Sequence, residues 1–238
     1  MGRSTYLIFT LTVCSLGACA PEGPTAFITQ NIAPDQTCVV SPDAMGSLIQ
    51  PSGSYDIAPG KKGACKNPYR VNLLVNSNLR ANPSEALGRP DPNTLQLTHA
   101  KVTLMLLNGS IINFNDPGET ARPNPFLTKT ANSLPSSSGT MPSTGIATVE
   151  VIPASYAEKL DSDAVLGGNI EAEIQIFGTT VGDVDIDLAP FKYTIEICKG
   201  CMTMCVSKLV DVTREDVVGD RCDDDSGNDG RVCFDPDC

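Results

Sequence analysis

The 238-residue chain has few of the side chains that most often carry catalysis. It contains no tryptophan, only 5% aromatic residues and a single histidine, His99. A Ser/His/Asp triad would therefore have to use His99. The sequence has no nucleophile elbow, phosphate-binding loop, zinc-protease helix or dinucleotide-binding glycine pattern. We therefore predict that the protein is not an enzyme and has no catalytic residue, and we interpret His99 as a surface or hydrogen-bonded histidine.

Basic residues are also scarce. Lys and Arg total 17 against 28 Asp and Glu, which gives a net charge of −11. Nucleic-acid binding requires basic clusters to neutralise phosphates, and the sequence shows none, so we expect no nucleic-acid partner. The same balance argues against electrostatic docking to anionic lipid. Any contact with a membrane must have another source.

The N-terminal residues supply such a source. Arg3 precedes the uncharged and largely apolar run Tyr6–Leu16, YLIFTLTVCSL. This run is too short for a membrane-spanning helix, which needs about 20 residues. A positive charge followed by a short apolar run is typical of a secretory signal. The alternative, a buried N-terminal strand or helix, is opposed by the Pro and Gly residues at 21–24.

The tetrapeptide Leu-Gly-Ala-Cys that ends at Cys19 resembles the lipobox of bacterial lipoproteins. This resemblance implies that residues 1–18 are a signal peptide and that Cys19 is the first mature residue. The Cys19 thiol would then carry a diacylglycerol with acyl chains such as palmitate, which anchor the protein to a membrane. Ala20 follows the cysteine, and in the sorting rule of Gram-negative lipoproteins a residue other than Asp there implies the outer membrane.

Cysteine usage agrees with export. Of ten cysteines, Cys14 would leave with the leader and Cys19 would be acylated, so an even number of eight remains. In an oxidising compartment, four disulfides are the expectation. Eight cysteines allow 105 pairings, but their clustering suggests Cys38 with Cys65 and the other six among themselves. The eight are Cys38, Cys65, Cys198, Cys201, Cys205, Cys222, Cys233 and Cys238.

Strand patterns dominate the middle of the chain. Apolar residues alternate with polar ones at period two, which predicts strands with one buried face. A skip at 99–101 predicts a β-bulge, Asn108-Gly109 predicts a hairpin turn, and residues 153–160 predict a short helix. The fold class expected is all-β, an antiparallel, immunoglobulin-like β-sandwich. The alternating segments are 69–76, 95–97, 102–106, 146–152, 170–176, 184–188 and 191–197.

Composition divides the mature chain into three parts. We predict a flexible tether at 19–37 and a β-sandwich domain at 38–197, with irregular structure up to Pro68. Within this domain the proline-rich segment 115–145 fits no strand and is predicted to be a mobile loop. Residues 198–238 form a cysteine-rich acidic tail. A final strand, YTIEICKGC, followed by such a tail resembles exported bacterial lipoproteins that have a β-sandwich body and no assigned activity.

The tail offers two alternative metal sites. Asp223, Asp225 and Asp229 are oxygen donors near glycines, in a pattern that faintly resembles a calcium loop. Thiolates and thioethers of the kind that suit Cu(I) are also clustered there. The competing interpretations are a solvated acidic end and structural disulfides, so no cofactor is expected, with calcium as the alternative. The sulfur cluster consists of Cys198, Cys201, Met202, Met204 and Cys205.

These observations lead to a hypothesis about function. We expect an exported, membrane-anchored lipoprotein of the cell envelope with a structural, adhesive or binding role. The alternative is a metal-binding module that uses the tail. The sequence does not identify the protein or surface-polymer partner.

Overall fold

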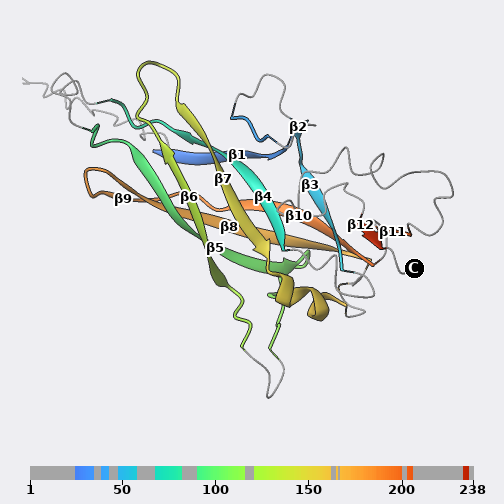
Figure 1. Ribbon diagram of the computed structural model, residues 1–238. Helices are drawn as coiled ribbons and strands as arrows, with labels where there is room; N and C mark the ends of the chain where they lie inside the picture. Colours follow the sequence, from blue (N-terminus) through green and yellow to red (C-terminus); the bar gives the residue numbers. More distant parts are fainter. Residues whose placement is uncertain are drawn as a thin grey trace, which may run out of the picture.

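A computed structural model of the chain describes residues 25–34, 39–42, 48–57, 68–81, 90–115, 121–161, 165, 167–199, 203–205 and 233–235 (Figure 1). Nearly all regular structure in these ranges is β-strand, arranged as two larger sheets and one two-stranded ribbon. The prediction of an all-β fold is therefore confirmed. No helix within the described ranges has both the length and the apolar character needed to span a membrane.

The first sheet has four strands in the order β2-β1-β4-β7, and all its pairs are antiparallel. β4 (Tyr69–Ser77) and β7 (Ser143–Ile152) form its longest ladder. β1 (Ala26–Ala33) pairs along β4, and the short β2 (Leu48–Ile49) pairs with the end of β1. The sheet therefore contains a strand from the N-terminal part of the described chain.

The second sheet has the order β3-β10-β8-β5-β6. These strands are β3 (Ser52–Asp56), β10 (Phe191–Cys198), β8 (Asn169–Thr180), β5 (Leu95–Leu106) and β6 (Phe126–Leu134). β3 and β10 run parallel, so the expectation of a purely antiparallel fold is wrong at this pair. The two strands lie far apart in the sequence, and no hairpin turn constrains their relative direction.

One hydrophobic core joins the two sheets, and residues from both contribute to it. Along β8, every second side chain is buried, which confirms the alternation predicted there. The core residues of β8 are Ile170, Ala172, Ile174 and Ile176, and those of β4 include Tyr69, Val71, Leu73 and Val75. Burial of these faces against each other is the main source of stability.

β5 contains the predicted bulge. Its pairing with both β6 and β8 shifts between Leu97 and His99. The buried positions change parity at the same point, from Leu95 and Leu97 to Ala100, Val102 and Leu104. Thr98 is the extra residue relative to β8. The extra residue shifts the alternation by one position, so odd-numbered residues face the core before the bulge and even-numbered residues face it afterwards.

The predicted turn at Asn108-Gly109 is confirmed. Gly109 has φ +83, and the Leu106 backbone N–H donates to the Ser110 carbonyl at 2.9 Å. Only one isolated bridge, between Met105 and Ile111, continues the hairpin. The chain leaves the ladder after the turn, so the expected second strand is reduced to this bridge.

Two predicted segment boundaries are wrong. The tether predicted at 19–37 contains β1, and the mobile loop predicted at 115–145 contains β6. β1 has a bulge between Ile28 and Gln30, which breaks its alternation. In β6 only every fourth residue is buried, and the central one is the polar Thr130. Neither strand therefore has the simple apolar alternation that identifies a strand from sequence.

The segment before Pro68 also contains the strands β2 and β3, where irregular structure was predicted. The short helix predicted at 153–160 is a 3₁₀ helix, η2 (Ala154–Leu160), which directly follows Pro153. Proline fits the start of a helix because it needs no N–H partner there. Two further short strands, β11 (Thr203–Cys205) and β12 (Cys233–Asp235), pair in parallel.

Candidate functional site

An open groove lies where one edge of the second sheet is interrupted. β9 (Asp185–Asp187) pairs with residues 177–179 of β8, and β10 pairs with residues 169–174 of the same strand. Between β9 and β10 the chain passes through Pro190, which has no N–H to donate to a ladder. The two short strands therefore occupy the same edge of β8 with a break between them.

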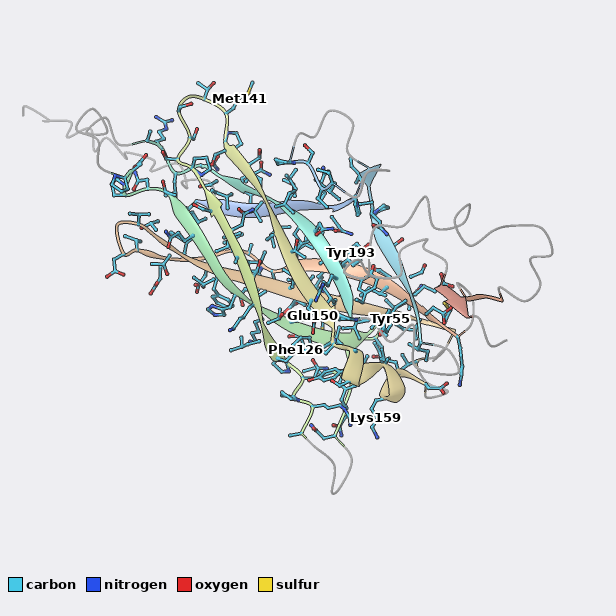
Figure 2. All side chains as sticks on the ribbon, viewed as in Figure 1. Tyr55, Phe126, Met141, Glu150, Lys159 and Tyr193 are labelled. Atoms are coloured by element: carbon cyan, nitrogen blue, oxygen red, sulfur yellow. The ribbon has the colours of Figure 1, made fainter. Side chains whose placement is uncertain are left out.

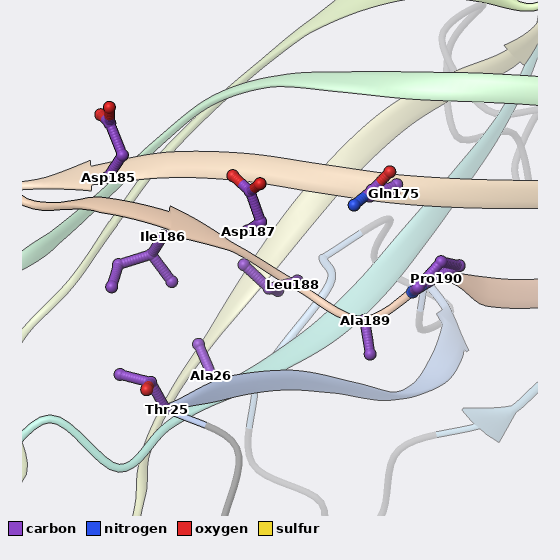
Figure 3. Close-up of a pocket in the computed structure, with 9 residues that line it drawn as sticks. All are labelled: Thr25, Ala26, Gln175, Asp185, Ile186, Asp187, Leu188, Ala189 and Pro190. Atoms are coloured by element: carbon purple, nitrogen blue, oxygen red, sulfur yellow. The ribbon is translucent and has the colours of Figure 1, made fainter.

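The groove has a volume of about 490 Å³. The start of β1 forms one wall and the β9–β10 connection forms the other (Figure 3). In Figure 3, Ile186 points toward Thr25 and Ala26, whereas the carboxylates of Asp185 and Asp187 point away from them. The groove interior is thus mainly apolar. Its lining residues are Thr25, Ala26, Gln175, Asp185, Ile186, Asp187, Leu188, Ala189 and Pro190.

The aspartates of this region lie at the surface, as the alternation with Val184, Ile186 and Leu188 predicted. Asp185 accepts a hydrogen bond from the Thr179 hydroxyl at 3.0 Å, and Asp187 is exposed. Asp183 has φ +64, a left-handed conformation that aspartate tolerates in turns. The described ranges contain no group of three or more side chains arranged to hold a metal ion.

His99 lies beside the bulge of β5 and stacks on Phe177, with ring centroids 4.8 Å apart and an interplanar angle of 9°. Its Nδ1 is 2.9 Å from the Thr98 hydroxyl oxygen, and that hydroxyl donates to the Phe177 carbonyl at 3.2 Å. A hydroxyl has one proton to donate, so His99 Nδ1 is the donor in the tautomer in which the Thr98 hydroxyl donates to the carbonyl, and the acceptor in the other tautomer. A triad base would instead direct Nδ1 at a carboxylate.

A buried polar cluster links the two sheets. The Asn31 side-chain amide donates to the Tyr193 hydroxyl at 3.0 Å, and its oxygen accepts the Asn72 backbone N–H at 2.8 Å. The hydroxyls of Tyr69 and Tyr193 are 3.5 Å apart. Tyr55 packs edge-to-face on Tyr69 with ring centroids 5.7 Å apart. These tyrosines were not recognised from the sequence as a group, because they come from three strands far apart in the chain.

Burial raises the pKa of the Tyr55 hydroxyl well above its ordinary value, and the nearby carboxylates of Glu150 and Asp56 raise it further. Desolvation disfavours the tyrosinate anion, and negative neighbours disfavour it as well. Tyr55 is therefore held in its neutral form. The cluster is a buried, hydrogen-bonded part of the core that joins the two sheets.

Cys198 ends β10 and is disulfide-bonded, with its sulfur 3.7 Å from the Tyr55 carbonyl oxygen. In the β11–β12 ribbon, Cys205 pairs with Asp235 and Cys233 pairs with Thr203. The four-disulfide arrangement and both metal sites stay predictions. The remaining predicted site residues lie outside the described ranges: Cys19, Cys38, Cys65, Cys201, Cys222, Cys238, Asp223, Asp225 and Asp229.

Comparison with known proteins adds no relative. No family model matches the chain, and no curated protein is similar to it.

Proposed function

We propose that the chain is an exported bacterial lipoprotein, held at the outer membrane by acyl chains on Cys19, with a binding or adhesive role and no catalysis. The single observation that carries this proposal is the leader, in which a charged start and a short apolar run end at Leu-Gly-Ala-Cys19. Under this proposal the two-sheet body is an immunoglobulin-like β-sandwich, and the tail is an extension stabilised by disulfides.

The arrangement of the described domain supports a display role. β1 begins at Ala26, seven residues after Cys19, so the folded body would start close to its anchor. The open groove between β1 and the β9–β10 connection is a concave surface of the described domain. Clefts lined by apolar side chains are the usual places for small ligands or peptide segments to bind. The partner is a protein or a surface polymer of the envelope.

The test is membrane fractionation of two matched variants of the full chain, produced in a bacterium that acylates lipoproteins. Cys19→Ser removes the proposed acylation site, so the protein should move from the membrane fraction to the soluble fraction. Cys14→Ser is the control, because Cys14 would leave with the leader, and this variant should remain in the membrane fraction. Retention of Cys19→Ser in membranes to the same extent as Cys14→Ser would disprove the anchor.

A further inference from the structure

We propose that one end of the domain, where β1 begins, is a membrane-contact surface that rests on the phospholipid bilayer. This inference depends on the proposed Cys19 anchor and adds the orientation of the protein on its membrane. We call this end the β1 end. It consists of Thr25, the chain after β4 (78–81), the chain before β5 (90–94), the β6–β7 loop (135–142) and the β8–β9 turn (181–184).

The proposed anchor is close in sequence to the β1 end. The Thr25 carbonyl accepts the Asn78 backbone N–H at 2.8 Å, so the described chain starts within this group of loops. Only five residues separate Cys19 from Thr25. Even a fully extended chain covers at most about 20 Å over that distance. An acylated Cys19 therefore keeps the β1 end, and not the opposite end, within reach of the bilayer.

Hydrogen bonds tie the loops of the β1 end to one another. Ser137 donates its N–H to Leu79 and accepts the Ala81 N–H, which fixes the β6–β7 loop against the end of β4. The Asn93 side chain donates to the Arg80 carbonyl at 2.7 Å, and the Ser136 hydroxyl donates to Asp91.

The turn between β8 and β9 is held in the same way. Its Val181 N–H donates to the Thr94 carbonyl at 2.9 Å, and its Gly182 N–H donates to the Pro92 carbonyl at 2.8 Å. Together these bonds connect all the loops of the β1 end. The end therefore presents its loop tips as one surface, because each loop is bonded to a neighbour.

The tips of these loops expose apolar side chains. Met141 is 81% exposed, Val184 is 56% exposed and Val181 is 42% exposed. Figure 2 shows Met141 at the tip of the β6–β7 loop, away from the core. Exposed apolar side chains lose hydration on entering the boundary between lipid head groups and acyl chains, which favours binding. A weak contact of this kind adds to the anchor, since several membrane signals act together.

The charge at the β1 end specifies which lipids are needed. Asp183 lies between the two exposed valines, and Asp185, just beyond this end, is also exposed. These two carboxylates outnumber the one exposed cation among the described residues of the β1 end, Arg80. These carboxylates would be repelled by anionic lipids and cannot sink deeply into a bilayer. The contact is therefore shallow and apolar. It does not require anionic phospholipid, in agreement with the acidic composition of the chain.

Tryptophan fluorescence provides the test, because the chain has no tryptophan of its own. The acylated full chain carrying Met141→Trp is reconstituted into phosphatidylcholine vesicles whose acyl chains are brominated, and bromine quenches a nearby indole. The matched control is Leu107→Trp. Leu107 is 62% exposed but follows the far end of β5, about 40 Å from Thr94 along the strand.

We expect the Met141→Trp indole to be quenched several-fold more than the Leu107→Trp indole. Val184→Trp should behave like Met141→Trp, and addition of phosphatidylglycerol should not increase the quenching. Equal quenching of the two ends, or none at either, in a sample whose intact mass shows lipid on the chain, would overturn the orientation and leave the anchor intact. Absence of lipid from the chain in that mass would overturn the anchor and the orientation together.

Discussion

Asn31 connects the two sheets through its side-chain amide. The residue is 2% exposed, and both ends of the amide are used, one by the Tyr193 hydroxyl and one by the Asn72 backbone N–H. A polar side chain at a core position is normally a cost, and here two hydrogen bonds offset it. If the Asn31 amide is removed, the Tyr193 hydroxyl and the Asn72 N–H lose a hydrogen-bond partner. Leaving a buried polar group unsatisfied costs more free energy than one hydrogen bond contributes to stability.

We therefore predict that Asn31→Ala lowers the free energy of unfolding by about 2 kcal/mol. The matched control is Asn169→Ala. Asn169 is exposed at the start of β8, and its replacement should change stability by less than about 0.5 kcal/mol. Urea unfolding of both variants measures the difference. A loss for Asn31→Ala no larger than that of the control would show that the amide does not join the sheets.

Tyr55 makes stability depend on alkaline pH. The ordinary pKa of tyrosine is 10.0, and burial raises the pKa of Tyr55 well above this value in the folded protein. The unfolded chain loses this proton near pH 10.0 while the folded protein keeps it, so protons are bound more tightly by the folded state. The contribution of Tyr55 to the free energy of unfolding is therefore complete below pH 10.0 and is lost as the pH rises above that value.

The predicted result is that the urea midpoint falls when the pH is raised from neutral to above 10.0. In Tyr55→Phe this fall should be smaller, because the variant has no hydroxyl at residue 55 to ionise on unfolding. The same fall in both proteins would contradict a raised pKa at Tyr55. The ultraviolet absorbance of tyrosinate, recorded at the same time, reports how many hydroxyls ionise before unfolding.

At the scale of elements, β5 and β8 are tightly packed beside the bulge. Gly178 in β8 pairs with Leu97, the last residue before the register shift. A Cβ atom at Gly178 would lie 2.7 Å from the Gln96 carbonyl oxygen and 3.0 Å from Leu95 Cδ1. The closer atom belongs to the backbone, which cannot rotate away as a side chain can. Only glycine fits at this position without displacing β5.

We predict that Gly178→Ala destabilises the protein by about 1–3 kcal/mol, which is typical of overpacking. Gly139→Ala is the control, since a Cβ atom there would have nothing within 4 Å. Thermal unfolding should show a lower midpoint for Gly178→Ala and an unchanged midpoint for Gly139→Ala. Equal midpoints for the two variants would mean that β5 and β8 can move apart to accept a Cβ atom at residue 178 without loss of stability.

Strands differ in how well the sequence predicts them. β8 and β10 were predicted because each buries one face along its whole length, which gives a clear alternation. β6 lies at an edge of its sheet and packs against β7, where the Asn132 side chain donates to the Ile146 carbonyl. Its core positions are Phe126, Thr130 and Leu134, and the Thr130 hydroxyl has no hydrogen-bond partner within the described residues. A strand of this kind depends on tertiary neighbours that no local pattern shows.

The candidate sites were even less accessible to sequence reasoning. The groove combines the first residues of β1 with residues 185–190, and only folding brings these segments together. The one local signal was Pro190, which interrupts the alternation between 184–188 and 191–197. The loops of the β1 end are likewise joined mainly by backbone hydrogen bonds, which every residue type except proline can donate.

At the scale of the whole molecule, the proposed anchor lies close in sequence to one end of the domain. Exposed apolar side chains gather at both ends of the long strands, with Met141, Val181 and Val184 at the β1 end. Leu107 and Ile111 lie at the opposite end. Because the proposed anchor is separated from Thr25 by only five residues, it distinguishes these two ends. One would face the bilayer, and the other would face the surroundings and be accessible to partners.

The most direct test of the central claim is the intact mass of the wild-type protein extracted from the membranes of an acylating bacterium. Our account predicts a chain that starts at Cys19, carries a diacylglycerol, and has lost eight hydrogens through disulfide formation among its eight remaining cysteines. A mature chain that starts at another residue and carries no lipid would contradict the account.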